Sequence, residues 1–165
     1  MKKVLFTIVV LIGVSFLGCE NPIGNGEVEA ISGGFRVRFE LQSGLSNRNQ
    51  SVFRSNDTIR FQSFFINIRN KRSVFYTGPL FDININQSEK KVIGQWDGYL
   101  FQRPIFEIKI DENDTLRNNW SVAANRLKPG NYKAELLTNI YEENRYVYDE
   151  NGKRFKLVLD IEIVP

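Results

Sequence analysis

The stretch GFRVRFELQS, residues 34–43, alternates apolar and polar residues from Phe35 to Gln42. Because successive side chains of a strand point to opposite faces, its Phe, Val and Leu residues fall on one face and its Arg, Glu and Gln residues on the other. A period of two with one apolar face predicts an antiparallel strand that is half buried.

Segments with the same character recur through the rest of the chain. They are 57–70, 74–77, 80–86, 92–96, 103–110, 115–122, the part of 125–140 that follows Pro129-Gly130, and 155–164. Polar stretches such as 44–57 and turn signals such as Asn151-Gly152 separate them. No convincing helix of ten residues follows the N-terminal segment. About eight or nine strands with this spacing predict an all-β, antiparallel β-sandwich.

One segment changes its apolar phase. In 57–70 the pattern begins with Ile59 and Phe61 and continues with Phe64, Ile66 and Ile68. An extra residue in one strand shifts the alternation in this way, so the pattern predicts a β-bulge between Phe61 and Phe64.

The N-terminus has the layout of an export signal. Lys2 and Lys3 precede 14 uncharged residues, 4–17, and then Gly18 and Cys19 follow. This run fits a signal-peptide core and is too short for a membrane-spanning helix. The segment resembles a bacterial lipoprotein signal, although Phe16 stands where such signals usually carry Leu.

The resemblance to lipoproteins implies cleavage after Gly18 and a lipid on the sulfur of Cys19. It divides the chain into a signal peptide (1–18), a lipidated tether (19–30) and a sandwich domain (31–165). It also implies a location in the cell envelope, at the outer membrane or the periplasmic face in a Gram-negative cell. Glu20, in place of Asp, favours the outer membrane.

Composition limits the chemistry of the exported part. The chain has 22 Lys+Arg and 19 Asp+Glu, and losing Lys2 and Lys3 leaves 20 against 19, so no nucleic-acid partner is predicted. The chain has no His and a single Cys, which excludes Ser-His-Asp and Cys-His catalysis and the usual zinc ligand sets. Carboxylate-pair and Ser-Lys chemistry remain open. We expect a protein that is not an enzyme and has no cofactor.

The stretch LKPGNYKAEL, residues 127–136, carries the pattern Leu-x-Pro-Gly-x-Tyr. In immunoglobulin-like sandwiches this pattern enters a late strand, and the Tyr hydroxyl caps a backbone group near the corner. The pattern predicts that Tyr132 forms such a tyrosine corner.

Residues 57–140 resemble the intracellular proteinase inhibitor (BsuPI) family in the order and spacing of short motifs. The matching positions are Asn70, Gly78, Phe81-Asp82-Ile83, Trp96, Phe101, Trp120 and Pro129-Gly130-x-Tyr132. The resemblance implies a β-sandwich, and the founding activity of the family is inhibition of a cytoplasmic serine protease. An exported chain does not meet a cytoplasmic target, and no reactive-loop motif is present to match.

Several residues are candidates for binding. An aromatic and cationic stretch contains Tyr141, Arg145, Tyr146 and Tyr148, which are residue types common in binding hot spots. Trp96 and Trp120 lie in strand phase with apolar neighbours, which favours core packing over a ligand groove. The stretch DEND, 111–114, offers oxygen ligands for calcium, but it lacks the spacing of an EF-hand loop and a plain turn is favoured.

These observations predict a membrane-anchored lipoprotein that binds a protein partner, for which a protease is one possibility, through loops at one end of the sandwich. Two alternatives remain open. One is a structural or assembly role in the envelope, and the other is a carbohydrate- or cell-wall-associated binding module.

Overall fold

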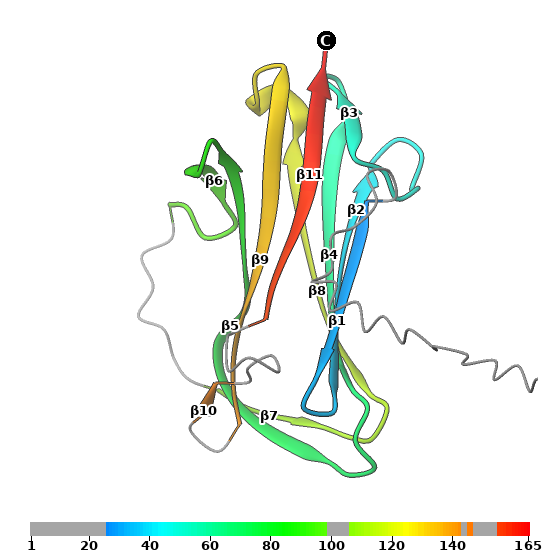
Figure 1. Cartoon of the computed structure of the whole chain (residues 1–165), viewed down its shortest axis with the longest axis vertical. Coiled ribbons are helices and arrows are strands. Elements are labelled where there is room, and N and C mark those ends of the chain that lie inside the picture. The colour runs from blue at the N-terminus through cyan, green and yellow to red at the C-terminus, as the bar shows by residue number, and fades with distance from the viewer. Residues whose placement is uncertain (1–25, 99–105, 143–144, 147–154) are drawn as a thin grey trace, which may run out of the picture.

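The computed structural model describes residues 26–98, 106–142, 145–146 and 155–165. In these residues, strands form two sheets that pack face to face (Figure 1). The first sheet has the order β1 (Glu27–Ser32), β2 (Phe35–Ser43), β4 (Thr58–Asn67), β8 (Thr115–Ala123). Across the same ranges, no helix reaches the length and apolarity that a membrane crossing requires.

The second sheet is larger. Its order is β3 (Val52–Arg54), β11 (Lys156–Val164), β9 (Gly130–Glu142), β5 (Ser73–Gln87), β6 (Lys90–Gly94). β7 (Phe106–Ile110) pairs with the first residues of β5, and β10 (Arg145–Tyr146) pairs with the last residues of β9. A short 3-10 helix, η1 (Ala124–Arg126), follows β8. The chain passes between the sheets as in an immunoglobulin-like sandwich, which confirms the predicted fold.

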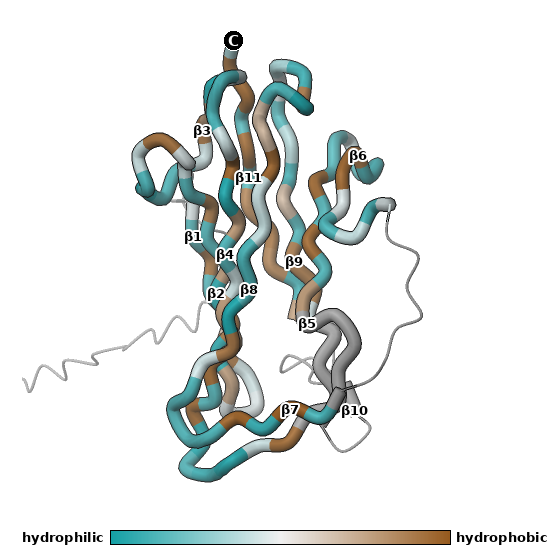
Figure 2. Tube along the Cα trace, turned by 180° about the vertical axis from the view of Figure 1, so that it is seen from behind, coloured by the Kyte–Doolittle hydropathy of each residue, from teal (hydrophilic) through white to brown (hydrophobic). Residues whose placement is uncertain are grey.

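The alternation seen in the sequence builds the core. Apolar and polar residues alternate along the strands (Figure 2), and the apolar ones face the opposite sheet. Aromatic rings dominate the interior, with the Phe35 and Phe65 centroids 5.0 Å apart and those of Phe61 and Trp120 4.8 Å apart. The largest fully buried rings are Phe35, Phe39, Phe53, Phe61, Phe65, Phe81 and Phe155. A Phe-rich core of this kind needs no disulfide.

The predicted β-bulge in 57–70 is wrong. β4 pairs with β2 and with β8 in unbroken register, and Ser63 fills the inward position between Phe61 and Phe65. Phe64 therefore lies on the outer face, yet only 8% of it is exposed. The guanidinium of Arg38 lies 4.4 Å from its ring centre and that of Arg117 5.7 Å, so cation-π contacts shield this ring from water.

Two further boundaries differ from the sequence prediction. The tether predicted over 19–30 ends at Gly26, because Glu27 begins β1 and pairs with Glu40 of β2. The domain predicted over 31–165 therefore begins at residue 27. The polar loop predicted over 44–57 contains β3, which pairs with β11 in parallel and is the exception to the antiparallel pattern. Both strands are short and mix polar with apolar residues, so alternation alone did not mark them.

The predicted tyrosine corner is confirmed. Tyr132 is buried at the start of β9, and its hydroxyl donates a hydrogen bond to the carbonyl oxygen of Lys128 at 2.8 Å. The bond fixes the chain where it leaves η1 and turns into the second sheet.

Replacing Tyr132 with Phe is expected to lower the free energy of unfolding by about 1 kcal/mol, because one net hydrogen bond is lost while the ring stays packed. Urea unfolding measures the change. Thr138→Val is the matched control, since Thr138 Oγ1 is buried and has no hydrogen-bond partner in the described part of the chain. A Tyr132→Phe loss no larger than the control's would contradict the structural role of the corner.

Candidate binding surfaces

The predicted recognition residues lie at one end of the sandwich, where β9 meets β10. Backbone pairing places Tyr146 directly opposite Tyr141, and Arg145 directly opposite Glu142. The sequence marked these residues as binding candidates without predicting this strand pairing. Tyr148 and Cys19 lie outside the described residues.

A third tyrosine joins this register. Tyr76 of β5 lies directly opposite Tyr141, so Tyr76, Tyr141 and Tyr146 occupy corresponding positions on three neighbouring strands. On its other side Tyr76 pairs with Glu107 of β7. Sequence reasoning missed Tyr76, because no local pattern reveals which distant strand a residue will pair with. We call Tyr76, Tyr141 and Tyr146 the tyrosine row.

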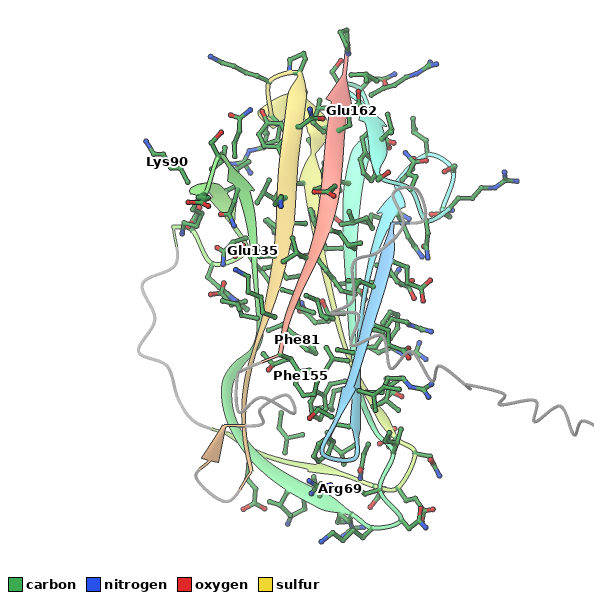
Figure 3. All side chains as sticks on the ribbon, in the orientation of Figure 1. Arg69, Phe81, Lys90, Glu135, Phe155 and Glu162 are labelled. Carbon is green, nitrogen blue, oxygen red and sulfur yellow. The ribbon has the colours of Figure 1, made fainter. Side chains whose placement is uncertain are left out.

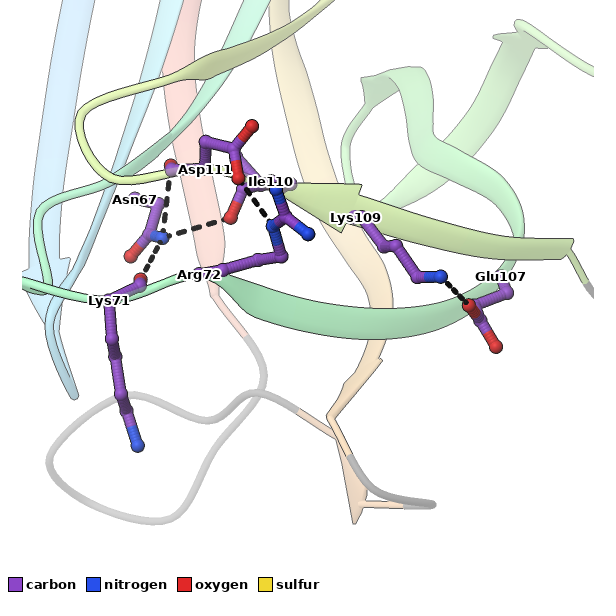
Figure 4. A network of polar contacts seen from close by, with 7 residues as sticks. All are labelled: Asn67, Lys71, Arg72, Glu107, Lys109, Ile110 and Asp111. Atoms are coloured by element: carbon purple, nitrogen blue, oxygen red, sulfur yellow. Dashed lines mark hydrogen bonds and ion pairs between the residues drawn. The ribbon is translucent and has the colours of Figure 1, made fainter.

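Two turns beside the tyrosine row are joined by one buried amide (Figure 4). Asn67 is 0% exposed, and its Nδ2 donates to the carbonyl oxygens of Lys71 at 2.8 Å, Asp111 at 3.1 Å and Ile110 at 3.2 Å. Its Oδ1 accepts a hydrogen bond from the Arg69 backbone amide at 3.1 Å. This single side chain therefore ties the β4–β5 turn to the β7–β8 turn.

The β7–β8 turn contains the DEND stretch. The Asp111 carboxylate is 2.5 Å from Arg72 Nε, and this hydrogen bond raises the pKa of the exposed Arg72 guanidinium (Figure 4). Asp114 Oδ1 accepts a hydrogen bond from the Thr115 amide, and Asn113 takes a positive φ of 59°. These are the contacts of a turn. Where the chain is described, no three His, Cys, Asp or Glu side chains gather as a metal site would require.

The β1–β2 turn at the same end depends on Arg69. Its guanidinium lies 4.1 Å from the Phe35 ring centre, and its Nε donates to the Gly33 carbonyl oxygen at 2.8 Å. Gly34 has a φ of +82°, and a Cβ there would lie 2.5 Å from Arg69 Cγ. Only glycine fits both the conformation and the close approach.

The two tryptophans are structural. The indole of Trp120 stacks on Phe61 and packs against the core together with Leu116, on the side of β8 that the sequence predicted. Trp96 is half-buried, and its Nε1 donates to the Phe81 carbonyl oxygen at 2.9 Å. The core interpretation of Trp120 is confirmed, whereas Trp96 follows the end of β6 at Gly94, lies in a turn, and is not among the described residues that pack on the core.

A shallow polar pocket lies on the outer face of the second sheet. Its volume is about 410 Å³, and it is lined by Asn86, Ser88, Glu89, Asn131, Tyr132, Lys133, Glu135 and Asp160. Carboxylates and amides dominate this lining. Glu135 also forms an ion pair with Lys156 at 2.9 Å. Sequence reasoning did not single out this pocket, because its residues come from three strands and the β5–β6 turn.

The outer face of the first sheet carries paired charges. Arg38 Nε lies 2.8 Å from Glu40 Oε1, and Arg36 Nε lies 3.4 Å from Glu29 Oε1. Glu40 is buried, and this burial raises the pKa of its carboxyl, while the charge of Arg38 opposes the rise. Arg36 and Arg38, on the polar face of the predicted strand, thus form ion pairs with acids of the same sheet.

The comparisons with known proteins bear on the fold alone. No protein-family model matches the chain, and no curated protein matches its sequence. Among solved structures, the C-terminal domain of wzt is similar at 12% identity and a TM-score of 0.46, over 84% of this chain and 78% of that one. The CARDB domain of the PF1109 protein from Pyrococcus furiosus is similar at 9% identity and a TM-score of 0.43, over 83% and 95%.

The β-glucosidase from Listeria innocua is similar at 6% identity and a TM-score of 0.41, over 79% of this chain but only 16% of that one. Similarities this distant carry no argument about activity or ligand.

Proposed function

We propose that the chain is a non-enzymatic lipoprotein of the bacterial cell envelope, anchored through Cys19, that binds a protein partner. The proposed binding surface is the end formed by the β1–β2, β4–β5 and β7–β8 turns and the β9–β10 hairpin, which we call the distal end. The resemblance to the proteinase inhibitor family favours a protease as that partner.

The observation that carries the proposal is that the start of the domain and the tyrosine row lie towards opposite ends of the sandwich. The Gly26 carbonyl oxygen accepts a hydrogen bond from Leu41 N, two residues before the end of β2, beside the β2–β3 loop. Figure 3 shows Arg69 at the distal end, with Lys90 and Glu162 towards the other end. A lipid on Cys19 would hold the Gly26 side near the membrane.

The reach of the tether is short compared with the domain. From Cys19 to Gly26 an extended chain spans at most about 25 Å. β5 alone, from Ser73 to Gln87, spans about 45 Å at the usual strand rise. The distal end would therefore face away from the lipid surface, where a second protein has room to bind.

The residue types at the distal end suit protein recognition. Tyr and Arg are enriched in binding hot spots because they combine large contact area with hydrogen-bonding groups. The tyrosine row, Arg145 and the exposed Arg72 bring these types to one end.

A crosslinking experiment tests the proposal. In cells, a photoreactive residue in place of the exposed Lys71 is expected to capture one stoichiometric protein, and Tyr146→Ala is expected to reduce the recovery about tenfold or more, as the loss of a hot-spot residue does. Lys90→Ala, at the other end, is the matched control and is expected to leave the recovery unchanged. Equal recovery with Tyr146→Ala, or no captured protein, would contradict the proposal.

A carbohydrate-binding function is the second candidate, and the pocket near Glu135 and Asp160 favours it. Carboxylate and amide groups can hydrogen-bond sugar hydroxyls. Specific retention on a glycan array that is lost in Asp160→Asn would support this candidate over the first. The hypothesis that the protein partner is a protease has its own test. If the protein does not affect any of a panel of secreted serine proteases, that hypothesis is refuted.

A further inference from the structure

We infer that the end of the sandwich opposite the distal end is a docking surface for anionic phospholipid headgroups. We call it the proximal end and define it by the β2–β3 loop (44–51), β3, the β3–β4 turn (55–57), and η1 with residues 127–129. The inference rests on the proposed lipid anchor and adds the orientation of the domain and the lipid class that it contacts.

Hydrogen bonds hold these segments together at one end. Ala124 N donates to the Asp57 carbonyl oxygen at 2.9 Å, and Ser55 N donates to that of Val164 at 3.0 Å. Gly26 packs so closely on the backbone of Gln50 that a Cβ on it would lie 2.5 Å from the Gln50 carbonyl oxygen. The chain therefore enters the domain directly against the β2–β3 loop.

Exposed cations gather here without matching exposed acids in the same segments. The exposed cationic residues of these segments are Arg48, Arg54, Arg126 and Lys128, and Arg60 at the start of β4 adjoins them through its hydrogen bond to Asn47 Oδ1. Over 44–60 and 124–129 the sequence has one acid, Asp57, which is buried and accepts a hydrogen bond from the Ser43 hydroxyl at 2.6 Å. Three acids from neighbouring segments adjoin this end: Glu27 Oε2 accepts a hydrogen bond from Asn49 Nδ2 at 3.2 Å, Glu162 of β11 lies opposite Val52, and Asp97 interacts electrostatically with Arg126. The exposed cations outnumber these acids. The surface therefore favours an anionic partner.

The β2–β3 loop of this surface carries an exposed apolar side chain, that of Leu45. Leu45 is 72% exposed, more than any other large apolar residue in the described part of the chain. Its loop is held in shape, because the Ser43 hydroxyl accepts hydrogen bonds from the amides of Leu45 at 3.1 Å and Ser46 at 3.3 Å. The loop thus presents Leu45 to its surroundings together with the exposed Arg48, an arrangement that suits the headgroup layer of a membrane.

The tether indicates which partner the proximal end contacts. A lipid on Cys19 lies within about 25 Å of Gly26, so the bilayer that holds it is the nearest large anionic surface. Each contact between a basic residue and an anionic leaflet is weak, but the anchor makes the contact intramolecular in effect and raises its occupancy.

The test uses the native lipidated protein in vesicles. A fluorophore is placed at Leu45→Cys or, as the matched control at the distal end, at Glu112→Cys, and quencher is attached to the lipid headgroups. In phosphatidylglycerol vesicles we expect quenching at 45 to exceed that at 112 about threefold or more, and to fall towards the control value in phosphatidylcholine or at high salt. Arg48→Glu with Arg54→Glu should abolish the difference, and Lys109→Glu at the distal end should leave it intact.

Equal quenching at 45 and 112 on vesicle-bound protein would overturn the inference and leave the anchor standing. Protein that does not stay with the vesicles would overturn the anchor, and with it the premise of the inference. A difference that persists unchanged in phosphatidylcholine would also overturn it, because an anionic headgroup would then be unnecessary.

Discussion

Replacing Asn67 with Asp is expected to lower the free energy of unfolding by about 3 kcal/mol at neutral pH. The substitution keeps the size and shape of the side chain and removes its two amide protons. Three carbonyl oxygens, those of Lys71, Ile110 and Asp111, then face an acceptor in place of a donor. Because Asn67 is fully buried, water cannot replace the lost hydrogen bonds.

The loss should depend on pH with a definite sign. Burial among carbonyl oxygens would raise the pKa of an Asp at this position above its unfolded value of about 4. The folded variant therefore binds its proton more tightly than the unfolded variant does. Relative to wild type, the deficit is smallest below the unfolded pKa and grows as the pH rises towards the folded pKa. Urea unfolding of both proteins across this pH range measures the difference.

Asn118→Asp is the matched control for this experiment. Asn118 pairs with the side chain of Gln95 at 3.2 and 3.5 Å and is only partly buried, so its substitution is expected to cost less than about 1 kcal/mol. If Asn67→Asp cost no more than Asn118→Asp, the amide would not be what joins the two turns.

The sandwich could be predicted from the sequence because its strands carry their own pattern. In β2 every inward residue except Ser43 is apolar and every outward one is polar, so the strand predicted over 34–43 agrees with the observed Phe35–Ser43. β11 carries the same alternation. The Pro129-Gly130-x-Tyr132 motif is equally local, since the tyrosine hydroxyl reaches back only to Lys128.

The errors arise where distant residues decide the outcome. Phe64 points outward because Arg38 of β2 and Arg117 of β8 cover its ring, and neither arginine is a sequence neighbour. β3 is a strand because it pairs with β11 at the far end of the chain. The candidate surfaces follow the same rule. The pairing of Tyr141 with Tyr146 is local, but the sequence carried no turn signal between them, and the pairing with Tyr76 required the fold.

The largest effect is expected from replacing Cys19 with Ala, which should abolish stable lipid anchoring. Cys19 is the only thiol in the chain, so no other residue can form the thioether that the proposed anchor requires. Each buried CH₂ contributes about 0.8 kcal/mol to membrane binding, and a single acyl chain holds a protein only marginally, whereas two or more hold it durably. Removing the attachment atom therefore removes the anchoring energy as a whole.

Two measurements check this prediction, namely fractionation of cells and the intact mass of the purified protein. Wild type should be membrane-bound, and its mass should exceed that of the polypeptide 19–165 by the attached lipid. The Cys19→Ala protein should be released, or stall with residues 1–18 still attached, and in both cases it should carry no acyl mass. Its sandwich should unfold at the wild-type urea concentration, because β1 begins only at Glu27. Ser15→Ala, which leaves the thiol in place, is the control and should behave as wild type. An unmodified thiol on the native protein would refute the anchor, because the tether would then have no hold on the bilayer.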